Sequence, residues 1–478
     1  MKINKIILGL AVATSLVAAQ SCSKIDEFGD INTNPNRATE PVPSALLTNV
    51  LSNLGNNLGW DQGGINTVAG LYAQYFSETQ YTEASRYAKP TFNVDGYYTG
   101  ALADLQTIII YNTDAATSTK ANQYGTNANQ IAIARILKAQ YFKFLTDAFG
   151  DIPYFTALKA NNGSNTYDKQ QDIYPDIIKE LKEASAQLNT SAPIAVQGDI
   201  LFGGNISKWK KYANSLRALA ALNLAKVNPT MGASEFNAAI TAGVIESNSD
   251  NATIVYPGGK FPQPFYNYYN ITQRKDYAVS KSFTDRTSSD PRRTQFGSSQ
   301  VGFPYGLTRD QAVAFATANT NYANVLSPAN RQATSPLTII GAANMWLARA
   351  EAAQRGWTTE NKVTVYGTGV QRSMEQWGVY NAIDYAAYIA SNPPTDLAAI
   401  ATQEWISWYP NGMEGWNTWR RTGSPTLAPA PGMPTIPRRF PYGPNEYNLN
   451  LANVKAAGDR YAVAGVSDSQ FARIWWDQ

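Results

Sequence analysis

Apolar residues recur at intervals of three and four along most of the chain, which is the spacing of one face of an α-helix. The longest run, from Ile133 to Ala148, stops at Gly150, a residue type that commonly ends helices. The pattern predicts a mostly α-helical protein. Helices are expected over residues 44–58, 63–76, 129–149, 337–355, 371–390 and 396–409.

Two more helices are predicted from the residues at their starts. Pro175 suits the first turn of a helix, because the backbone N–H that proline lacks has no helical partner there. Ser207 can cap a helix that carries Trp209 and Leu216 on its inner face. Short links between paired helices favour a right-handed stack that resembles tetratricopeptide repeats.

Long stretches without helical periodicity separate these helices. They cover residues 77–100, 247–335 and 422–470, and they are rich in Gly, Pro, Asn and aromatic residues. Loops of this length in a compact domain are usually functional or disordered, and their aromatic content argues against disorder. We therefore predict an irregular half of the protein that carries the ligand site.

The N-terminus is typical of a bacterial lipoprotein signal. A short basic start precedes an apolar run over residues 6–19, and Cys22 follows. The run is shorter than the roughly 20 apolar residues of a membrane-spanning helix. An ordinary secretory peptide with Cys22 unmodified is the alternative. We predict a signal peptide over 1–21, a tether over 22–43 that is lipidated at Cys22, and a single domain over 44–478.

Composition excludes several kinds of chemistry. The chain has 39 basic and 36 acidic residues, so nothing indicates a nucleic-acid surface. It contains no histidine, which excludes a Ser-His-Asp triad and histidine metal sites. Its one cysteine is Cys22, so we expect no disulfide and no thiol catalysis. Glycoside hydrolysis by two carboxylates and oxygen-ligated calcium remain chemically possible.

Several short motifs stand in order along the chain after the lipidation cysteine. They are DINTNPN at 30–36, FGDIPY at 149–154, DPR at 290–292, LARAEAAQRGW at 347–357, EGWNTWRRTG at 414–423 and IPRRFPYGPNEYNLN at 436–450. As an ordered set they resemble the SusD/RagB-like family of outer-membrane glycan-binding lipoproteins, and most closely its SusD-like type 2 subgroup. From the residues themselves, we expect buried arginine–carboxylate pairs that organise the loops.

The resemblance implies a fold, a place and a partner. The implied fold has four tetratricopeptide-like helix pairs that support an irregular ligand-binding half. The implied place is the outer membrane, anchored by lipid and exposed at the cell surface. The implied partner is a TonB-dependent outer-membrane barrel, over which the lipoprotein acts as a lid. Ligands in the family are usually oligosaccharides and sometimes peptides, and the family has no fixed ligand motif.

The candidate ligand residues therefore rest on their chemistry, since flat rings stack on the apolar faces of sugars. Five tryptophans in helical or motif context are expected in the core instead: Trp346, Trp405, Trp408, Trp416 and Trp419. The candidates lie in loops, and they are Phe261, Phe265, Tyr266, Asn267, Tyr268 and Tyr269, then Tyr81, Arg86 and Tyr87, and finally Trp60.

The sequence thus predicts a non-catalytic binding protein that captures oligosaccharide and delivers it to the transporter, with no cofactor and no metal. Two alternatives remain open. One is a helical-repeat lipoprotein that binds peptide or protein, and the other is a glycosidase that uses two carboxylates.

Overall fold

The computed structural model describes residues 40–159 and 165–478, and its body begins with a helix at Pro43. Cys22 and all but the end of the predicted tether lie outside the described residues. None of the helices in the described part has the length and apolar character needed to cross a membrane.

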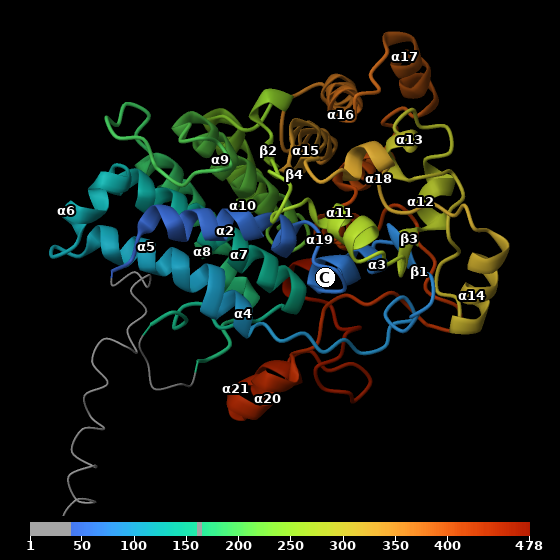
Figure 1. Cartoon of the computed structure of the whole chain (residues 1–478), viewed down its shortest axis with the longest axis horizontal. Helices are drawn as coiled ribbons and strands as arrows, with labels where there is room; N and C mark the ends of the chain where they lie inside the picture. Colours follow the sequence, from blue (N-terminus) through green and yellow to red (C-terminus); the bar gives the residue numbers. More distant parts are fainter. Residues whose placement is uncertain (1–39, 160–164) are drawn as a thin grey trace, which may run out of the picture. The chain divides into compact units, whose positions relative to one another are not determined.

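Helices make up most of the structure, as predicted. Four pairs of neighbouring helices stack in sequence: α7 with α8, α9 with α10, α15 with α16, and α18 with α19 (Figure 1). Helix α8 packs on α9, α9 on α15, and α15 on α18, so the pairs form one continuous layer. The bounds are α7 Asn127–Phe149, α8 Gln170–Gln187, α9 Ile206–Asn223, α10 Pro229–Ala242, α15 Ala342–Gln354, α16 Lys362–Gln376, α18 Leu397–Trp408 and α19 Gly412–Thr422.

The remaining helices flank this layer. Helix α2 packs on α5 and α5 packs on α7, while α3 packs on α19. Seven of them lie in stretches that were predicted to be irregular, and the longest of these are α14 and α21. The bounds are α2 Pro43–Leu58, α3 Ile65–Tyr72, α4 Asp95–Tyr97, α5 Ala103–Thr113, α6 Ser118–Ala121, α11 Pro264–Tyr266, α12 Lys281–Arg286, α13 Arg293–Phe296, α14 Arg309–Ala318, α17 Ala382–Ser391, α20 Pro444–Leu449 and α21 Leu451–Asp459.

Two small antiparallel sheets hold the loop-rich half together. Strand β1, Phe76–Glu78, pairs with β3, Tyr277–Val279. Strand β2, Ala252–Ile254, pairs with β4, Leu337–Ile340. Both pairings join segments that are far apart in sequence, so no pattern within one segment predicts them. They also shorten two predicted helices: 63–76 stops at Tyr72, and 337–355 begins only at Ala342.

Three further predictions of helix boundaries were wrong for local reasons. The predicted helix 371–390 is two helices, since α16 ends before Gly378, which has φ +68°, and α17 follows. Helix α8 begins five residues before Pro175, because the Gln170 N–H donates to Asp151 at 2.9 Å and fixes an earlier first turn. Asn205 rather than Ser207 caps α9, by accepting from the Lys208 N–H at 3.1 Å.

The motif residues are structural, as predicted. Arg421 on α19 pairs with both Glu351 at 2.8 Å and Glu404 at 2.7 Å, and all three side chains are buried. Arg292 pairs with Asp290 in the same way at 2.6 Å. The Arg421 cluster joins three helices of the layer, α15, α18 and α19, rather than a loop. Arg292 does fasten a loop to the layer, since it also donates to Ser373 on α16 at 2.8 Å and to Gln403 on α18 at 2.9 Å. Four of the five expected core tryptophans are buried, but Trp346 is only partly buried and stacks under the Arg349 guanidinium at 3.8 Å.

Candidate functional site

A long groove runs beside helix α2 and holds a volume of about 1340 Å³. One wall is α2, and the turn from α2 into α3 closes one part of it. Another wall is the segment that leads from β2 into α11, and Ile200 lines the groove from a loop whose Gly198 carbonyl accepts from the Thr48 hydroxyl of α2 at 3.0 Å. Its lining residues are Ala45, Thr48, Asn49, Ser52, Asn53, Asn56, Trp60, Asp61, Gln62, Ile200, Ile254, Val255, Tyr256, Pro257, Lys260, Phe261, Pro262, Pro264 and Asn267.

The α2 wall is polar and carries no charge. Leucines and a valine at helical spacing turn inward and are buried, as expected of an amphipathic helix. The outward positions that line the groove are Thr48, Asn49, Ser52, Asn53 and Asn56. Exposed helix positions are usually filled by Lys, Glu or other strong helix formers, and asparagine is a poorer choice. The wall therefore presents amides and hydroxyls where an ordinary solvated face would present charges.

Some of the side-chain amides in the groove already form hydrogen bonds within the protein, and others do not. The Asn49 side chain donates to Asp104 at 2.8 Å, and the Asn53 side chain donates to the Asn49 carbonyl at 2.9 Å. Within the described residues, the side-chain amides of Asn56, Gln62 and Asn267 have no hydrogen-bond partner. Each of these three amides offers both a donor and an acceptor to the groove.

The rest of the lining includes exposed apolar side chains. Val255 is 68% exposed, Phe261 67% and Ile200 46%. Single exposed apolar residues are common on protein surfaces, but here three border one groove. Phe261 is the one exposed ring among the groove's lining residues, while Val255 and Ile200 are branched aliphatics with no flat face.

Rigid packing supports the groove from below. The Trp60 ring stacks on Phe265 with centroids 4.5 Å apart and meets Tyr268 edge-on at 5.6 Å. Tyr256 lies against α2 at Gly55, where an added Cβ would come within 1.9 Å of the Tyr256 hydroxyl. Glycine in the middle of a helix costs stability, so close packing explains its presence at position 55.

The groove has little free charge. The Asp61 carboxylate accepts from the Asn66 N–H at 2.6 Å, the Thr67 N–H at 2.8 Å and the Thr67 hydroxyl at 2.6 Å. Burial raises the pKa of Asp61, and these hydrogen bonds oppose the shift. The Asp61 carboxylate therefore caps the first turn of α3 and is not free to bind a ligand. Lys260 is exposed, and its ammonium group has no ion-pair partner among the described residues.

The predicted residues of segment 261–270 fall into three groups. Phe261 and Asn267 line the groove together with Trp60, although Trp60 is only 2% exposed. Phe265, Tyr268 and Tyr269 are buried in the aromatic packing behind it, where they cannot stack on a ligand. Tyr266 is half-buried and is not among the groove's lining residues. The short helix α11 and the helical turn after it fold most of these rings inward.

The other predicted segment, 81–87, lies outside the groove lining. Tyr81 is 47% exposed, with the Arg309 guanidinium 5.7 Å from its ring centre. Arg86 is exposed. Tyr87 is buried, and its hydroxyl accepts from the Ala430 N–H at 3.0 Å. Segment 81–87 thus contributes no residue to the lining of this groove.

Our choice of aromatic loop residues missed the polar face of α2 and the aliphatic residues Val255 and Ile200. One signal could have found the first: the segment PSALLTNVLSNLGNNL contains no charged residue. No comparable signal marks Val255 or Ile200, because they belong to distant loops that only the fold brings together.

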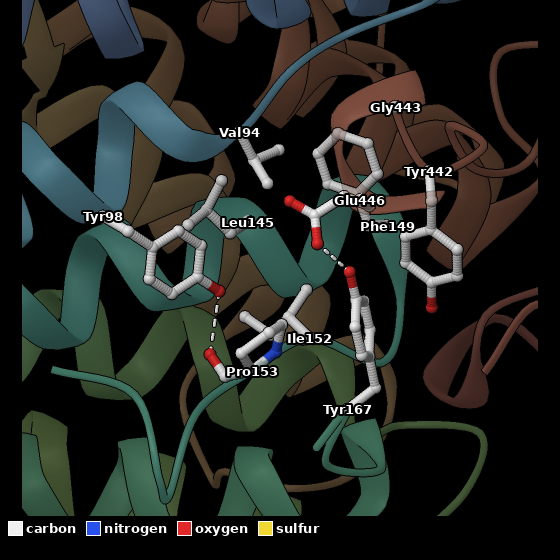
Figure 2. Close-up of a pocket in the computed structure, with 10 residues that line it drawn as sticks. All are labelled: Val94, Tyr98, Leu145, Phe149, Ile152, Pro153, Tyr167, Tyr442, Gly443 and Glu446. Carbon is white, nitrogen blue, oxygen red and sulfur yellow. Dashed lines mark hydrogen bonds between the residues drawn. The ribbon is translucent and has the colours of Figure 1, made fainter. Parts of the chain in front are cut away.

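A second cavity is too small to hold a ligand. It holds about 10 Å³, which is the space of a single water molecule. Figure 2 shows its polar groups turned toward one another: the Tyr98 hydroxyl donates to the Pro153 carbonyl at 2.8 Å, and the Tyr167 hydroxyl donates to Glu446. Burial raises the pKa of Glu446. At this cavity, Ile152, Pro153 and Tyr167 pack against the segment at 442–446.

Comparison with protein families places the chain. Residues 35–443 match the SusD-like family, which is described as starch-binding and associating with the outer membrane. The match covers most of the chain, so the protein belongs to this family. A comparison with curated proteins found no significant match.

Solved structures share the fold over nearly the whole chain. A structure described as a chitin-binding protein is 26% identical, with a TM-score of 0.76, and the alignment covers 91% of this chain and 100% of that chain. A SusD homologue from Bacteroides uniformis is 24% identical, with a TM-score of 0.76 and coverage of 91% and 99%. A chitin-binding SusD homologue from Flavobacterium johnsoniae is 22% identical, with a TM-score of 0.72 and coverage of 91% and 98%.

Proposed function

We propose that this protein is a non-catalytic lipoprotein that binds oligosaccharide in the groove beside α2 and delivers it to a TonB-dependent outer-membrane transporter. The observation that carries the proposal is the pairing of an uncharged amide and hydroxyl wall with an exposed apolar wall. Sugars present the same two surfaces, hydroxyl edges and apolar faces. The family description and the 26% identical chitin-binding structure both point to carbohydrate ligands.

The chemistry of the groove supports binding without catalysis. Glycoside hydrolysis usually needs two carboxyl groups on either side of the scissile bond. Asp61 is the one carboxyl residue among the groove's lining residues, and its oxygens are occupied by the start of α3. We expect no product when oligosaccharides are incubated with the protein, as checked by chromatography. Product that disappears in a variant with one neutralised carboxylate would contradict this.

Binding is tested by calorimetry with oligosaccharides derived from starch and from chitin. Phe261→Ala removes the one exposed ring of the groove and should weaken binding about tenfold or more, as loss of a central aromatic anchor does. Phe155→Ala is the matched control, because Phe155 is an exposed phenylalanine outside the groove lining. Equal affinity of both variants and the wild type would show that the groove is not the site. Binding of peptides instead of oligosaccharides would favour the alternative function.

The anchor and the partner are tested in cells. Cys22→Ser should release the protein from the membrane fraction if Cys22 carries the lipid, and retention would contradict the anchor. External protease should reach the wild-type protein in intact cells if it faces outward. Extraction in mild detergent should recover the chain together with a TonB-dependent barrel, and recovery only as a free monomer from crosslinked cells would contradict that partner.

A further inference from the structure

We propose that another pocket, between α12 and the segment 426–428, binds a sugar unit that carries a negative charge, as a carboxylate or a sulfate ester. This pocket holds about 400 Å³, which is within the range of ligand sites in proteins. Its walls are α12, Gln74 after the end of α3, and residues of 304–305 and 426–428. It shares no lining residue with the groove beside α2, so the inference assigns a separate site and goes beyond the proposed function.

Hydrogen bonds to one extended segment hold Gln74 and Arg286 next to each other. The Gln74 side-chain amide donates to the Ala428 carbonyl at 2.5 Å, and the Arg286 guanidinium donates to the Thr426 carbonyl. Thr426 and Ala428 are exposed and Leu427 between them is buried, which is the alternation of an extended chain. Positions two residues apart in such a chain face the same side and are roughly 7 Å apart. The amide and the guanidinium can therefore contact one sugar unit together.

Gln74 occupies a backbone position that favours glycine. Helix α3 ends in a Schellman motif, in which the Tyr75 N–H donates to the Gly70 carbonyl at 2.9 Å. Gln74 takes the left-handed position of this motif with φ +56°, where glycine would avoid the steric cost of a side chain. The glutamine side chain is only 2% exposed, and its amide oxygen has no hydrogen-bond partner among the described residues. That oxygen is thus free to accept from a sugar hydroxyl.

The side chains that line this pocket have a net positive charge. Lys281 and Asp285 of α12 form an ion pair at 2.6 Å, so their charges offset each other. Arg286 has no carboxylate partner among the described residues, since its guanidinium donates to the backbone carbonyls of Ser282 and Thr426. Several of its N–H donors remain free for a ligand. A charge-assisted hydrogen bond from a guanidinium to a ligand anion is stronger than a bond between neutral groups.

The other groups of the pocket fit the neutral part of such a sugar. The Ser282 hydroxyl has no partner among the residues that the structure describes, and it lies one helical turn before Arg286 on the same face of α12. Tyr305 and Ala428 add apolar surface beside these polar groups. A simple anion can use only Arg286, whereas a charged sugar can bond to Arg286, Ser282 and Gln74. The pocket therefore favours the charged sugar over both the simple anion and the neutral sugar.

Calorimetry on the wild-type protein at millimolar ligand concentrations compares glucuronate, glucose 6-sulfate, glucose and acetate. At least one charged sugar should bind about tenfold or more tightly than glucose and acetate, because hydrogen bonds to charged groups contribute more than neutral ones. The charged sugar that binds identifies carboxylate or sulfate as the recognised group. Added salt should weaken the binding, since it screens the attraction between charges. Equal affinity for a charged sugar and either control ligand, or no binding of the charged sugars, would overturn the inference.

Variants of α12 test where the charged sugar binds. Arg286→Gln should lower its affinity to about that of glucose, and Arg286→Lys should lose less, because lysine keeps the charge without the planar fork. Ser282→Ala should weaken binding several-fold with an unchanged Tm, which separates loss of a contact from loss of the fold. Arg293→Gln is the matched control, because Arg293 is also an exposed arginine that donates to a backbone carbonyl, and it lines neither pocket nor groove.

The two proposed sites fail independently of each other. Phe261→Ala should leave the affinity for the charged sugar unchanged, because Phe261 lines only the groove. A loss in Phe261→Ala with unchanged affinity in Arg286→Gln would put the charged sugar in the groove and overturn this inference. Failure of neutral oligosaccharides to bind would overturn the proposed function alone, provided that the charged sugar still binds and still requires Arg286.

Discussion

Phe261 and Tyr81 are both large exposed rings on loops, but their polar surroundings differ. Around Phe261 the groove presents side-chain amides with no partner in the described residues. Beside Tyr81 the polar groups are charged: the Arg309 guanidinium lies 5.7 Å from the ring centre, and Arg274 pairs with Asp276 at 2.5 Å. The two rings thus offer a ligand different neighbours, neutral amides at Phe261 and charged side chains at Tyr81.

The segments that carry Phe261 and Tyr81 also differ in the contacts that hold them in place. The segment of Phe261 leads into α11, whose Phe265 is stacked on Trp60 in the core. The segment of Tyr81 is held by a buried carboxyl group instead, since Glu78 accepts from the Ser85 N–H at 2.7 Å. The packing of aromatic rings does not change with pH, whereas the charge of a buried carboxyl group does. The groove should therefore be the more constant of the two surfaces.

The largest effect is expected from the ring beneath the groove. Trp60→Ala removes a buried indole that packs on Phe265, Tyr268 and Phe76. It should lower the free energy of unfolding by about 3–5 kcal/mol, as truncation of large buried aromatics does. Tyr81→Ala should lower it by less than about 0.5 kcal/mol, because that ring is on the surface. Denaturant unfolding measures both, and equal losses would contradict the comparison.

A smaller loss is expected where α2 meets the other wall. Gly55→Ala places a Cβ within 1.9 Å of the Tyr256 hydroxyl, so the ring or the helix must move. Overpacking of this kind costs about 1–3 kcal/mol, against a gain of up to about 1 kcal/mol in helix propensity. The control cannot be a glycine such as Gly378, because its φ of +68° would strain an alanine. Ser52→Ala on the exposed face of α2 is the control and should be neutral or stabilising.

Much of the helix layer was predictable because its signal is local. Residues 129–149 and 396–409 carry enough apolar positions at helical spacing to be recognised, and the structure has helices there. The arginine–carboxylate pairs were also predictable, since guanidinium and carboxylate groups in apolar motifs must be paired when buried. Strands β2 and β4 were not, because each has three or four residues and its partner lies far away in sequence.

The site was less predictable than the fold. Segment 261–270 contains many rings, and the sequence cannot show which of them face outward, because α11 has only three residues and no readable period. Phe265 and Tyr268 turned inward and Phe261 outward. The groove is also lined by Ile200 and Val255, which are far apart in sequence and which only the fold brings to the same groove.

A direct test of the comparison replaces one ring at a time. Phe261→Ala should weaken oligosaccharide binding about tenfold, whereas Tyr81→Ala should change it by less than about twofold. The sequence predicted that both segments would share one binding face, so this expectation for Tyr81 follows from its placement outside the groove. Calorimetry with one oligosaccharide decides between them. A tenfold loss in Tyr81→Ala with an unchanged Phe261→Ala would move the site to the Tyr81 surface.

The smallest effect concerns the dependence of stability on pH. Burial raises the pKa of Glu78 to about 7, well above the roughly 4.3 of an unfolded chain. Between these values the folded state binds more protons than the unfolded state, so the contribution of Glu78 to stability falls as pH rises from about 4.5 through 7. Glu78→Gln keeps a side chain that can accept from Ser85 but cannot ionise. Relative to the wild type, it should reduce the fall in Tm between pH 5 and pH 7.5 by about 1–3 °C.

Scanning calorimetry at both pH values measures this change, with Asp310→Asn as the control. Asp310 is an exposed carboxylate on α14, so its replacement should shift Tm by the same small amount at pH 5 and pH 7.5. An unchanged pH profile in Glu78→Gln would show that Glu78 is not the group that makes the Tyr81 segment sensitive to pH. Oligosaccharide affinity of Glu78→Gln should equal that of the wild type at both pH values, because the groove rests on ring packing and uncharged amides. A loss of affinity in this variant would show that the Tyr81 segment and the groove are one surface after all.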